Sequence, residues 1–293
     1  MKLAFSNSVF PELDLDGLIE KSSQWGYDGF ELTALHGEAD LGLIATLSDQ
    51  AEAVQQKLAA AGQRIAAINA GEFVAHDSTA REGGKRRVIS AIKAASAVGC
   101  RLVTVRPANE QRGAIHQRIL DSVVEGLAPA AREAEAAGIV LGIENSGAVA
   151  RTHDLWFVRD AVCSPAVRVC ISPRRSAQSG DSPSTVLNRL GASLAMVRFA
   201  TSDLPEQAFE GERFVPEAGS LNPEFLLEIL KGFAYEGWIG VNPAPGADEA
   251  AAGDALTHAA KFLRAETQRE QVVLTAYKGD KNTPKFTTRS ATA

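Results

Sequence analysis

The sequence has few cysteines and no long apolar segment, and each of these absences excludes a class of protein. None of the three cysteines, Cys100, Cys163 and Cys170, belongs to a Cys-x-x-Cys pair. We therefore expect buried, reduced thiols and no disulfide. No segment approaches the roughly 18 apolar residues that a membrane helix needs, and the N-terminus lacks a long apolar signal. These features predict a cytoplasmic protein.

Basic charge is also scarce. The chain has 30 lysines and arginines against 36 acidic residues, a formal net charge of −6. No stripe of lysine and arginine runs through the sequence, which argues against a nucleic-acid-binding protein. We therefore predict a small-molecule or protein partner, and neither nucleic acid nor membrane. The length of 293 residues suits one large α/β domain or two small ones.

Short apolar segments of the β type alternate with longer amphipathic segments along most of the chain. The strands are expected at residues 2–6, 29–33, 64–69, 102–106, 140–144, 167–171, 194–199 and 239–242. The helices are expected at residues 14–25, 48–61, 79–98, 114–137, 152–163, 182–190, 222–234 and 250–264. Glycines at 62, 99 and 138 follow helical segments, and Asp14, Asp181 and Asn222 are suitable N-caps.

Eight repeats of strand and helix predict a fold of the α/β class, a single (β/α)8 TIM barrel, for which about 250 residues are typical. A doubly wound open sheet is the alternative, but no Gly-x-Gly-x-x-Gly turn follows the first strand. We place the barrel at residues 1–266. Residues 267–293 are expected to be a C-terminal tail, either mobile or docking to a partner.

The segment from Gly138 to Asn145 is an apolar run that ends abruptly in Glu144. A glutamate at the end of a buried parallel strand is costly to desolvate, so it needs a cation, a metal ion or an open site beside it. A single carboxylate makes a poor metal site by itself. Glu144 is therefore the first candidate for a functional residue, and a general base is one possible role.

The order of these segments resembles the xylose isomerase-like barrel family of sugar isomerases and epimerases. The resemblance rests on Trp25 to Leu32, Ala97 to Val103, Ala137 to Asn145, Phe214 to Leu221 and Gly237 to Val241. It implies one or two divalent metals. Their ligands would be a glutamate after the fifth strand, an aspartate and a histidine after the sixth, a histidine after the seventh and a glutamate after the eighth.

Four of these five ligand positions are occupied by other residues. Glu144 matches, whereas Ser172 stands at the aspartate position, Arg175 and Arg198 at the histidine positions, and Asn242 at the second glutamate position. Arginine supplies a permanent positive charge but is no Lewis acid. Arg175 or Arg198 is therefore expected to replace the charge of the metal beside Glu144, and we predict no cofactor unless the ligands lie elsewhere in the sequence.

Several residues at predicted strand ends are candidates for ligand binding: Arg106, Arg175, Arg198, Asn242, His36 and Phe73. The guanidinium groups favour an anionic ligand such as a sugar acid or a sugar phosphate, although they equally suit structural ion pairs. The first functional hypothesis is a pseudoenzyme that binds a carbohydrate or an anion without metal. The alternative is an active isomerase, epimerase or lyase acting on a sugar, sugar phosphate or polyol derivative. A homo-oligomer, or a protein partner held by the tail, is a further possibility.

Overall fold

Eight parallel strands close into a barrel in the order in which they occur in the chain. The computed structural model describes residues 1–33, 43–75, 77–109, 115–205, 221–243, 248–269, 272–273 and 287–288. The strands are β1 (Lys2–Ser6), β2 (Gly29–Thr33), β3 (Arg64–Phe73), β4 (Leu102–Pro107), β5 (Val140–Glu144), β6 (Val167–Ile171), β7 (Leu194–Ala200) and β8 (Trp238–Asn242). Pairing of β1 with β8 completes the closure and confirms the predicted TIM barrel.

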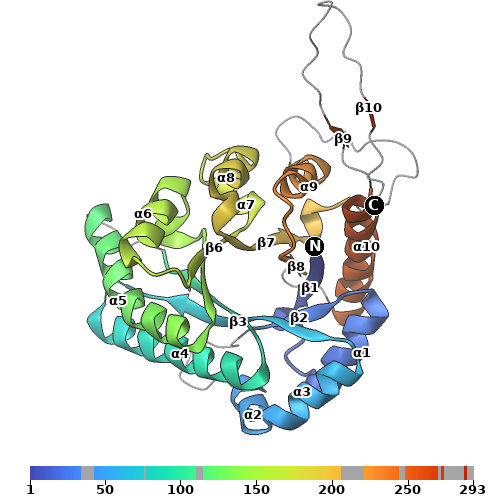
Figure 1. Ribbon diagram of the computed structural model, residues 1–293, viewed down its shortest axis with the longest axis horizontal. Helices are drawn as coiled ribbons and strands as arrows, with labels where there is room; N and C mark the ends of the chain where they lie inside the picture. Colours follow the sequence, from blue (N-terminus) through green and yellow to red (C-terminus); the bar gives the residue numbers. More distant parts are fainter. Residues whose placement is uncertain are drawn as a thin grey trace, which may run out of the picture.

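Helices surround the strands on the outside (Figure 1). They are α1 (Leu15–Trp25), α2 (Leu43–Asp49), α3 (Ala51–Ala60), α4 (Ser78–Val98), α5 (His116–Ala137), α6 (Thr152–Val162), α7 (Pro173–Gln178), α8 (Pro183–Leu190), α9 (Pro223–Gly232) and α10 (Glu249–Gln268). Short 3-10 turns occupy η1 (Asn7–Val9), η2 (Gly147–Val149), η3 (Gly191–Ser193) and η4 (Thr201–Asp203). Gly99 and Gly138 end α4 and α5 with positive φ, as expected for C-terminal glycines.

The helix expected at 48–61 corresponds to α3, whereas α2 before it and the short helix α7 were not predicted. Asp181 does not cap α8. Its carboxylate accepts hydrogen bonds from the backbone N–H and the hydroxyl of Thr152, both 2.7 Å long, and so caps the start of α6 from a distant point in the chain.

The apolar core has two parts, one on each side of the barrel wall. The larger part lies between strands and helices and includes Phe5, which meets Phe10, Trp25 and Tyr27 edge-on. The smaller part lies inside the barrel and is formed by Ala4, Ala66, Ala67, Leu102, Cys170 and Met196. We call this second cluster the inner layer. Alternation along the strands separates the two, because successive side chains point to opposite faces. Ala66 and Ala67 are both in the inner layer because the register of β3 against β2 shifts at this point.

Two of the three cysteines are buried as predicted, and the third is not. Cys100 and Cys170 are buried as predicted, but Cys163 is exposed because it follows α6 in a left-handed turn.

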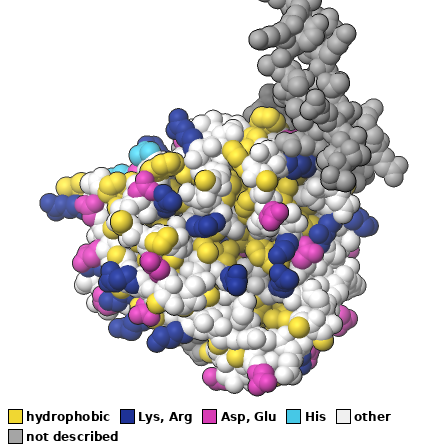
Figure 2. All heavy atoms as spheres, viewed as in Figure 1, with side chains coloured by type: hydrophobic (Ala, Val, Ile, Leu, Met, Phe, Trp, Pro, Cys, Tyr) yellow, Lys and Arg dark blue, Asp and Glu magenta, His cyan; other side chains and the backbone are white. Residues whose placement is uncertain are grey.

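Figure 2 shows lysine, arginine and acidic side chains interspersed on one face of the molecule. Within the described residues, no helix is both long and apolar enough to cross a membrane.

Little of the predicted tail lies within the described residues. Helix α10 runs to Gln268, and two short strands, β9 (Val272–Val273) and β10 (Thr287–Thr288), pair in antiparallel fashion. The boundary at residue 267 and the docking role stay predictions.

Candidate functional site

Arg198 lies at the centre of the site, on the inner face of β7 near the carboxyl ends of the strands. Its guanidinium is buried and binds side chains from three other strands. Nε donates to Glu31 on β2 at 3.0 Å, and Nη2 donates both to Glu31 and, at 3.0 Å, to Thr104 on β4. Nη1 lies 2.6 Å from Oε1 of Glu144 on β5. One arginine therefore joins two buried carboxylates across the barrel.

Both carboxylate oxygens of Glu144 have partners. Besides Arg198, Oε1 accepts a 3.2 Å hydrogen bond from the amide of Asn69 on β3. Oε2 accepts a 2.9 Å hydrogen bond from Nη1 of Arg175, whose side chain is 34% exposed. Charge-assisted hydrogen bonds of this kind are stronger than neutral ones, and they hold Glu144 in one orientation.

The two carboxylates differ in electrostatics although they share Arg198. Burial raises the pKa of Glu144, but the positive charges of Arg198, Arg175 and Arg106 outweigh it and hold the pKa below its ordinary value. Burial also raises the pKa of Glu31, and there Arg198 compensates only in part. The positive charges around the site therefore favour the ionised form of Glu144 more strongly than that of Glu31.

Helix α7 brings Arg175 to Glu144. Ser172 caps this helix through its side-chain oxygen and Pro173 occupies its first turn, a sequence that favours a helix start. Asn145 fixes the same turn from β5. Its side-chain oxygen accepts from the backbone N–H of Ser172 at 2.8 Å, and its amide donates to Ser176 at 3.0 Å. The short helix thus folds the chain back over the end of β5.

Arg106 and Asn242 lie at the same end of the barrel and are half-buried. The charge of Arg106 reaches Glu144, since it helps to lower the pKa of that carboxyl. Within the described residues, neither side chain has a hydrogen bond or an ion pair. Arg174 differs, because it is held by Asp203 and by the backbone and hydroxyl oxygens of Ser202.

The structure gathers some of the predicted site residues and separates others. Arg106, Arg175, Arg198 and Glu144 come together. Phe73 does not join them, and the prediction that it contacts a ligand disagrees with its position: it is fully buried against Gly84 of α4 and Gly126 of α5. His36 lies outside the described residues.

Three residues of the site were missed by sequence reasoning: Glu31, Asn69 and Thr104. Glu31 carried a usable signal, because it interrupts an apolar strand in the same way as Glu144 does in β5. Asn69 and Thr104 carried none, since single polar residues at strand ends are common in any barrel.

A divalent metal does not fit the described residues around Glu144. Arg198 and Arg175 occupy the carboxylate oxygens that a metal would need, and a dication would be repelled by both guanidinium groups. The Ser172 oxygen caps α7. Within the part of the chain that the structure describes, no three His, Cys, Asp or Glu side chains converge on a possible metal position.

The polar groups lie at the carboxyl ends of the barrel strands. This is the end at which α/β barrels carry their functional sites. The family model for the xylose isomerase-like TIM barrel matches residues 19–266, and the chain belongs to that family. None of the curated protein sequences compared with it matches.

Solved structures with the same fold share little sequence with this chain. The IOLI protein with a bound zinc atom is 18% identical at a TM-score of 0.72, covering 91% of this chain and 98% of that chain. D-Psicose 3-epimerase from Clostridium cellulolyticum H10, with D-tagatose, is 17% identical at 0.71, covering 92% and 100%. L-Ribulose 3-epimerase is 14% identical at 0.73, covering 91% and 94%. At these identities the likeness shows the fold.

Proposed function

We propose that this barrel binds a sugar or an anionic sugar derivative at the carboxyl ends of its strands without a divalent metal, and that it is a pseudoenzyme of its family. One observation carries the proposal: two guanidinium groups hold both oxygens of Glu144. They supply the positive charge that a metal would provide there, but not its power to polarise a substrate oxygen.

The ligand class follows from the groups that remain available. Arg106 has no described partner, and Arg175 is partly exposed. Planar guanidinium groups match carboxylates and phosphates, and the amide of Asn242 suits sugar hydroxyls. A structural relative contains D-tagatose, which supports a sugar as the body of the ligand.

Calorimetric titration with fructose, fructose 6-phosphate and gluconate, each in the presence of EDTA, tests this proposal. The two anions should bind more tightly than fructose. Arg106→Gln and Arg175→Gln should each weaken anion binding by about tenfold, the scale of one lost charge-assisted contact. Arg189→Gln on the exposed side of α8 is the matched control and should bind normally. Equal affinity for all three compounds, or equal loss in the control, would contradict the proposal.

A second candidate function, an active isomerase or epimerase, is favoured by the pair of carboxylates. Glu31 and Glu144 flank one guanidinium, and their pKa values are shifted in opposite directions. Such a separation is typical of an acid and base pair. In such an enzyme Glu144 would take a proton from a substrate carbon, and Glu31, whose pKa is raised, would return one.

Proton exchange distinguishes this candidate from the first. An enzyme of this kind incorporates deuterium from D2O at a substrate carbon, which NMR detects in a panel of ketoses and sugar phosphates. Glu144→Gln should abolish the incorporation. A panel without deuterium uptake, with and without added manganese, supports the pseudoenzyme, whereas uptake that depends on Glu144 supports the enzyme.

A further inference from the structure

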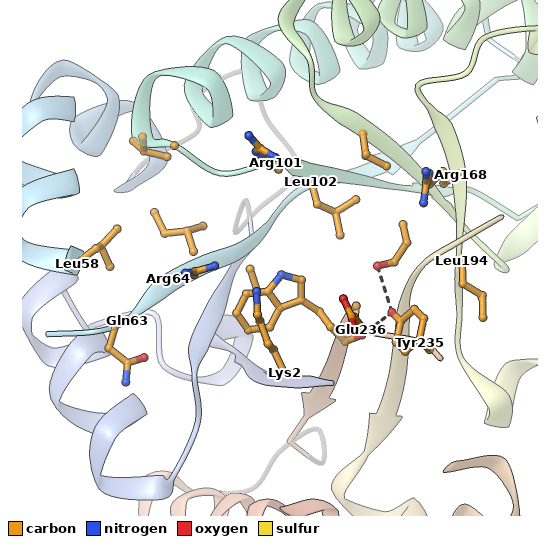
Figure 3. Close-up of a pocket in the computed structure, with 18 of the residues that line it drawn as sticks. Lys2, Leu58, Gln63, Arg64, Arg101, Leu102, Arg168, Leu194, Tyr235 and Glu236 are labelled. Carbon is orange, nitrogen blue, oxygen red and sulfur yellow. Dashed lines mark hydrogen bonds between the residues drawn. The ribbon is translucent and has the colours of Figure 1, made fainter. Parts of the chain in front are cut away.

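A hollow of about 1010 Å³ lies at the other end of the barrel, where the strands begin. Its walls come from the starts of β1, β3, β4, β6, β7 and β8 and from the turns before them (Figure 3). The inner layer lies between this hollow and the Glu144 site, because Ala4, Cys170 and Met196 fill the barrel there. The two ends are therefore separate sites.

Cations occupy positions at this end where a barrel usually places apolar side chains. Lys2 alternates with Ala4 on β1, and Arg168 alternates with Cys170 on β6. Since Ala4 and Cys170 belong to the inner layer, these two cations lie on the inner face of the barrel. Arg64 on β3 pairs with Gly29, two residues before inward-facing Glu31 on β2, and therefore shares that face. Barrel interiors are normally filled by bulky branched residues, so these cations leave a polar hollow where packing is usual.

The described residues do not neutralise these charges. Lys2, Arg64, Arg101 and Arg168 line the hollow and are exposed, and Glu236 is the one acidic residue among the described residues of its lining. None of the four cations has an ion pair with a described residue. Lys2 lies 5.6 Å from the centre of the Trp238 ring. Four cations and one carboxylate give the lining a formal charge of +3, in a chain whose net charge is −6.

Figure 3 shows Arg64, Arg101 and Arg168 on different sides of the hollow, with Lys2 between them. Like charges held around one space repel each other and add nothing to stability by themselves. The same arrangement attracts a ligand that carries negative groups at separate points, because guanidinium groups bind phosphate and carboxylate in pairs of hydrogen bonds.

We propose that this hollow is a second binding site and that its ligand is a small organic polyanion with at least two phosphate or carboxylate groups. Arg64 and Arg101 receive one group, and Arg168 receives another. Apolar side chains of the lining, including Leu102 and Leu194, contact the body of the ligand. The volume is that of a typical small-molecule site.

Calorimetric titration with ATP, citrate and inorganic phosphate tests this site. ATP or citrate should bind at one equivalent per chain and at least about tenfold more tightly than phosphate, and higher salt should weaken the binding. The double variant Arg64→Gln and Arg168→Gln should lose the binding by about tenfold or more. Both side chains are exposed, so the variant should keep the wild-type melting temperature.

Two controls make the outcome decisive. Arg118→Gln with Arg132→Gln removes the same charge from the exposed side of α5 and should bind like wild type. The Arg64 and Arg168 variant should still bind gluconate at the opposite end, which separates this site from the proposed function. The proposal is overturned if no polyanion binds, if phosphate binds as tightly as ATP and citrate, or if the α5 control loses as much affinity as the Arg64 and Arg168 variant.

Discussion

Arginines at the two ends of this barrel have opposite environments. At the carboxyl ends of the strands, Arg198 is buried and shared by two carboxylates. At the amino ends, Arg168 points toward the same interior but is exposed and has no acidic partner among the described residues. The inner layer, only a few residues thick along each strand, separates the two environments.

The difference shows how burial decides the role of a charged side chain. A buried guanidinium must be paired, because desolvation of an unpaired charge costs several kcal/mol. An exposed guanidinium stays solvated and remains available for an external ligand. The pairing at one end therefore fixes structure, and the unpaired charge at the other end favours recognition.

The largest expected effect comes from removing the paired cation. Arg198→Met leaves Glu31 and Glu144 buried without their shared partner and should lower the free energy of unfolding by about 3–5 kcal/mol. Arg168→Met should change it by about 0.5 kcal/mol or less, as for most surface positions. Urea denaturation of the two variants measures the difference. Equal destabilisation would break the comparison, and adding Glu31→Gln and Glu144→Gln to Arg198→Met should restore part of the loss.

The pH dependence of stability should separate the two glutamates. The pKa of Glu144 is lowered in the folded protein, so its contribution is present above its ordinary value of 4.5 and is lost as the pH falls through the folded pKa. The pKa of Glu31 is raised, so its contribution is present below 4.5 and is lost as the pH rises through the folded pKa. Thermal melts from acid to neutral pH measure both.

Single substitutions should change the dependence of the melting temperature on pH in different ways. Glu144→Gln should flatten the loss of stability on the acid side, and Glu31→Gln should flatten the decline above pH 4.5. Arg168→Met, at the other end, should keep the wild-type profile. Identical profiles for the two glutamine variants would contradict the opposite pKa shifts.

The cysteines report on the layer between the two ends. Burial raises the pKa of Cys170, which belongs to the inner layer, to about 12, and it raises the pKa of Cys100 to about 12 as well. A thiol reagent at pH 8 should therefore modify only exposed Cys163 in the native protein and all three thiols in urea. Rapid native modification of Cys170 would show that the inner layer opens.

The smallest expected effect concerns a carboxylate outside the barrel. Asp181 accepts two hydrogen bonds at the start of α6, and Asp181→Ala should cost about 1 kcal/mol, as for a helix cap. Urea denaturation measures it beside the Arg198 variant. If Asp181→Ala lowered the free energy of unfolding as much as Arg198→Met does, burial of the charged group would not determine how much each variant is destabilised.

The repeat of strands and helices was readable from the sequence because apolar segments, cap residues and glycines agree at most boundaries. Four strands have the predicted bounds: β1, β2, β5 and β6. The metal-ligand positions of the family also indicated that Arg175 and Arg198 lie beside Glu144. Helix α7 was missed because it is short, although Ser172 and Pro173 form a recognisable start.

The remaining details of the site depend on contacts that the sequence does not encode locally. Glu31 and Arg198 are 167 residues apart, so nothing in the pattern of either segment indicates their pairing. Phe73 was misplaced because β3 continues beyond Asn69 through an irregular register, which turns its side chain to the helices. The cations at the amino end were overlooked because a single basic residue at or beside the start of a strand is common.

Metal content tests the central claim most directly, which is that guanidinium groups take the place of a metal at Glu144. Elemental analysis of protein produced with added zinc and manganese, compared with Glu144→Gln produced in the same way, is the measurement. We expect far less than one metal ion per chain and no difference between the two proteins. One equivalent of metal in the wild type that is lost in Glu144→Gln would contradict it.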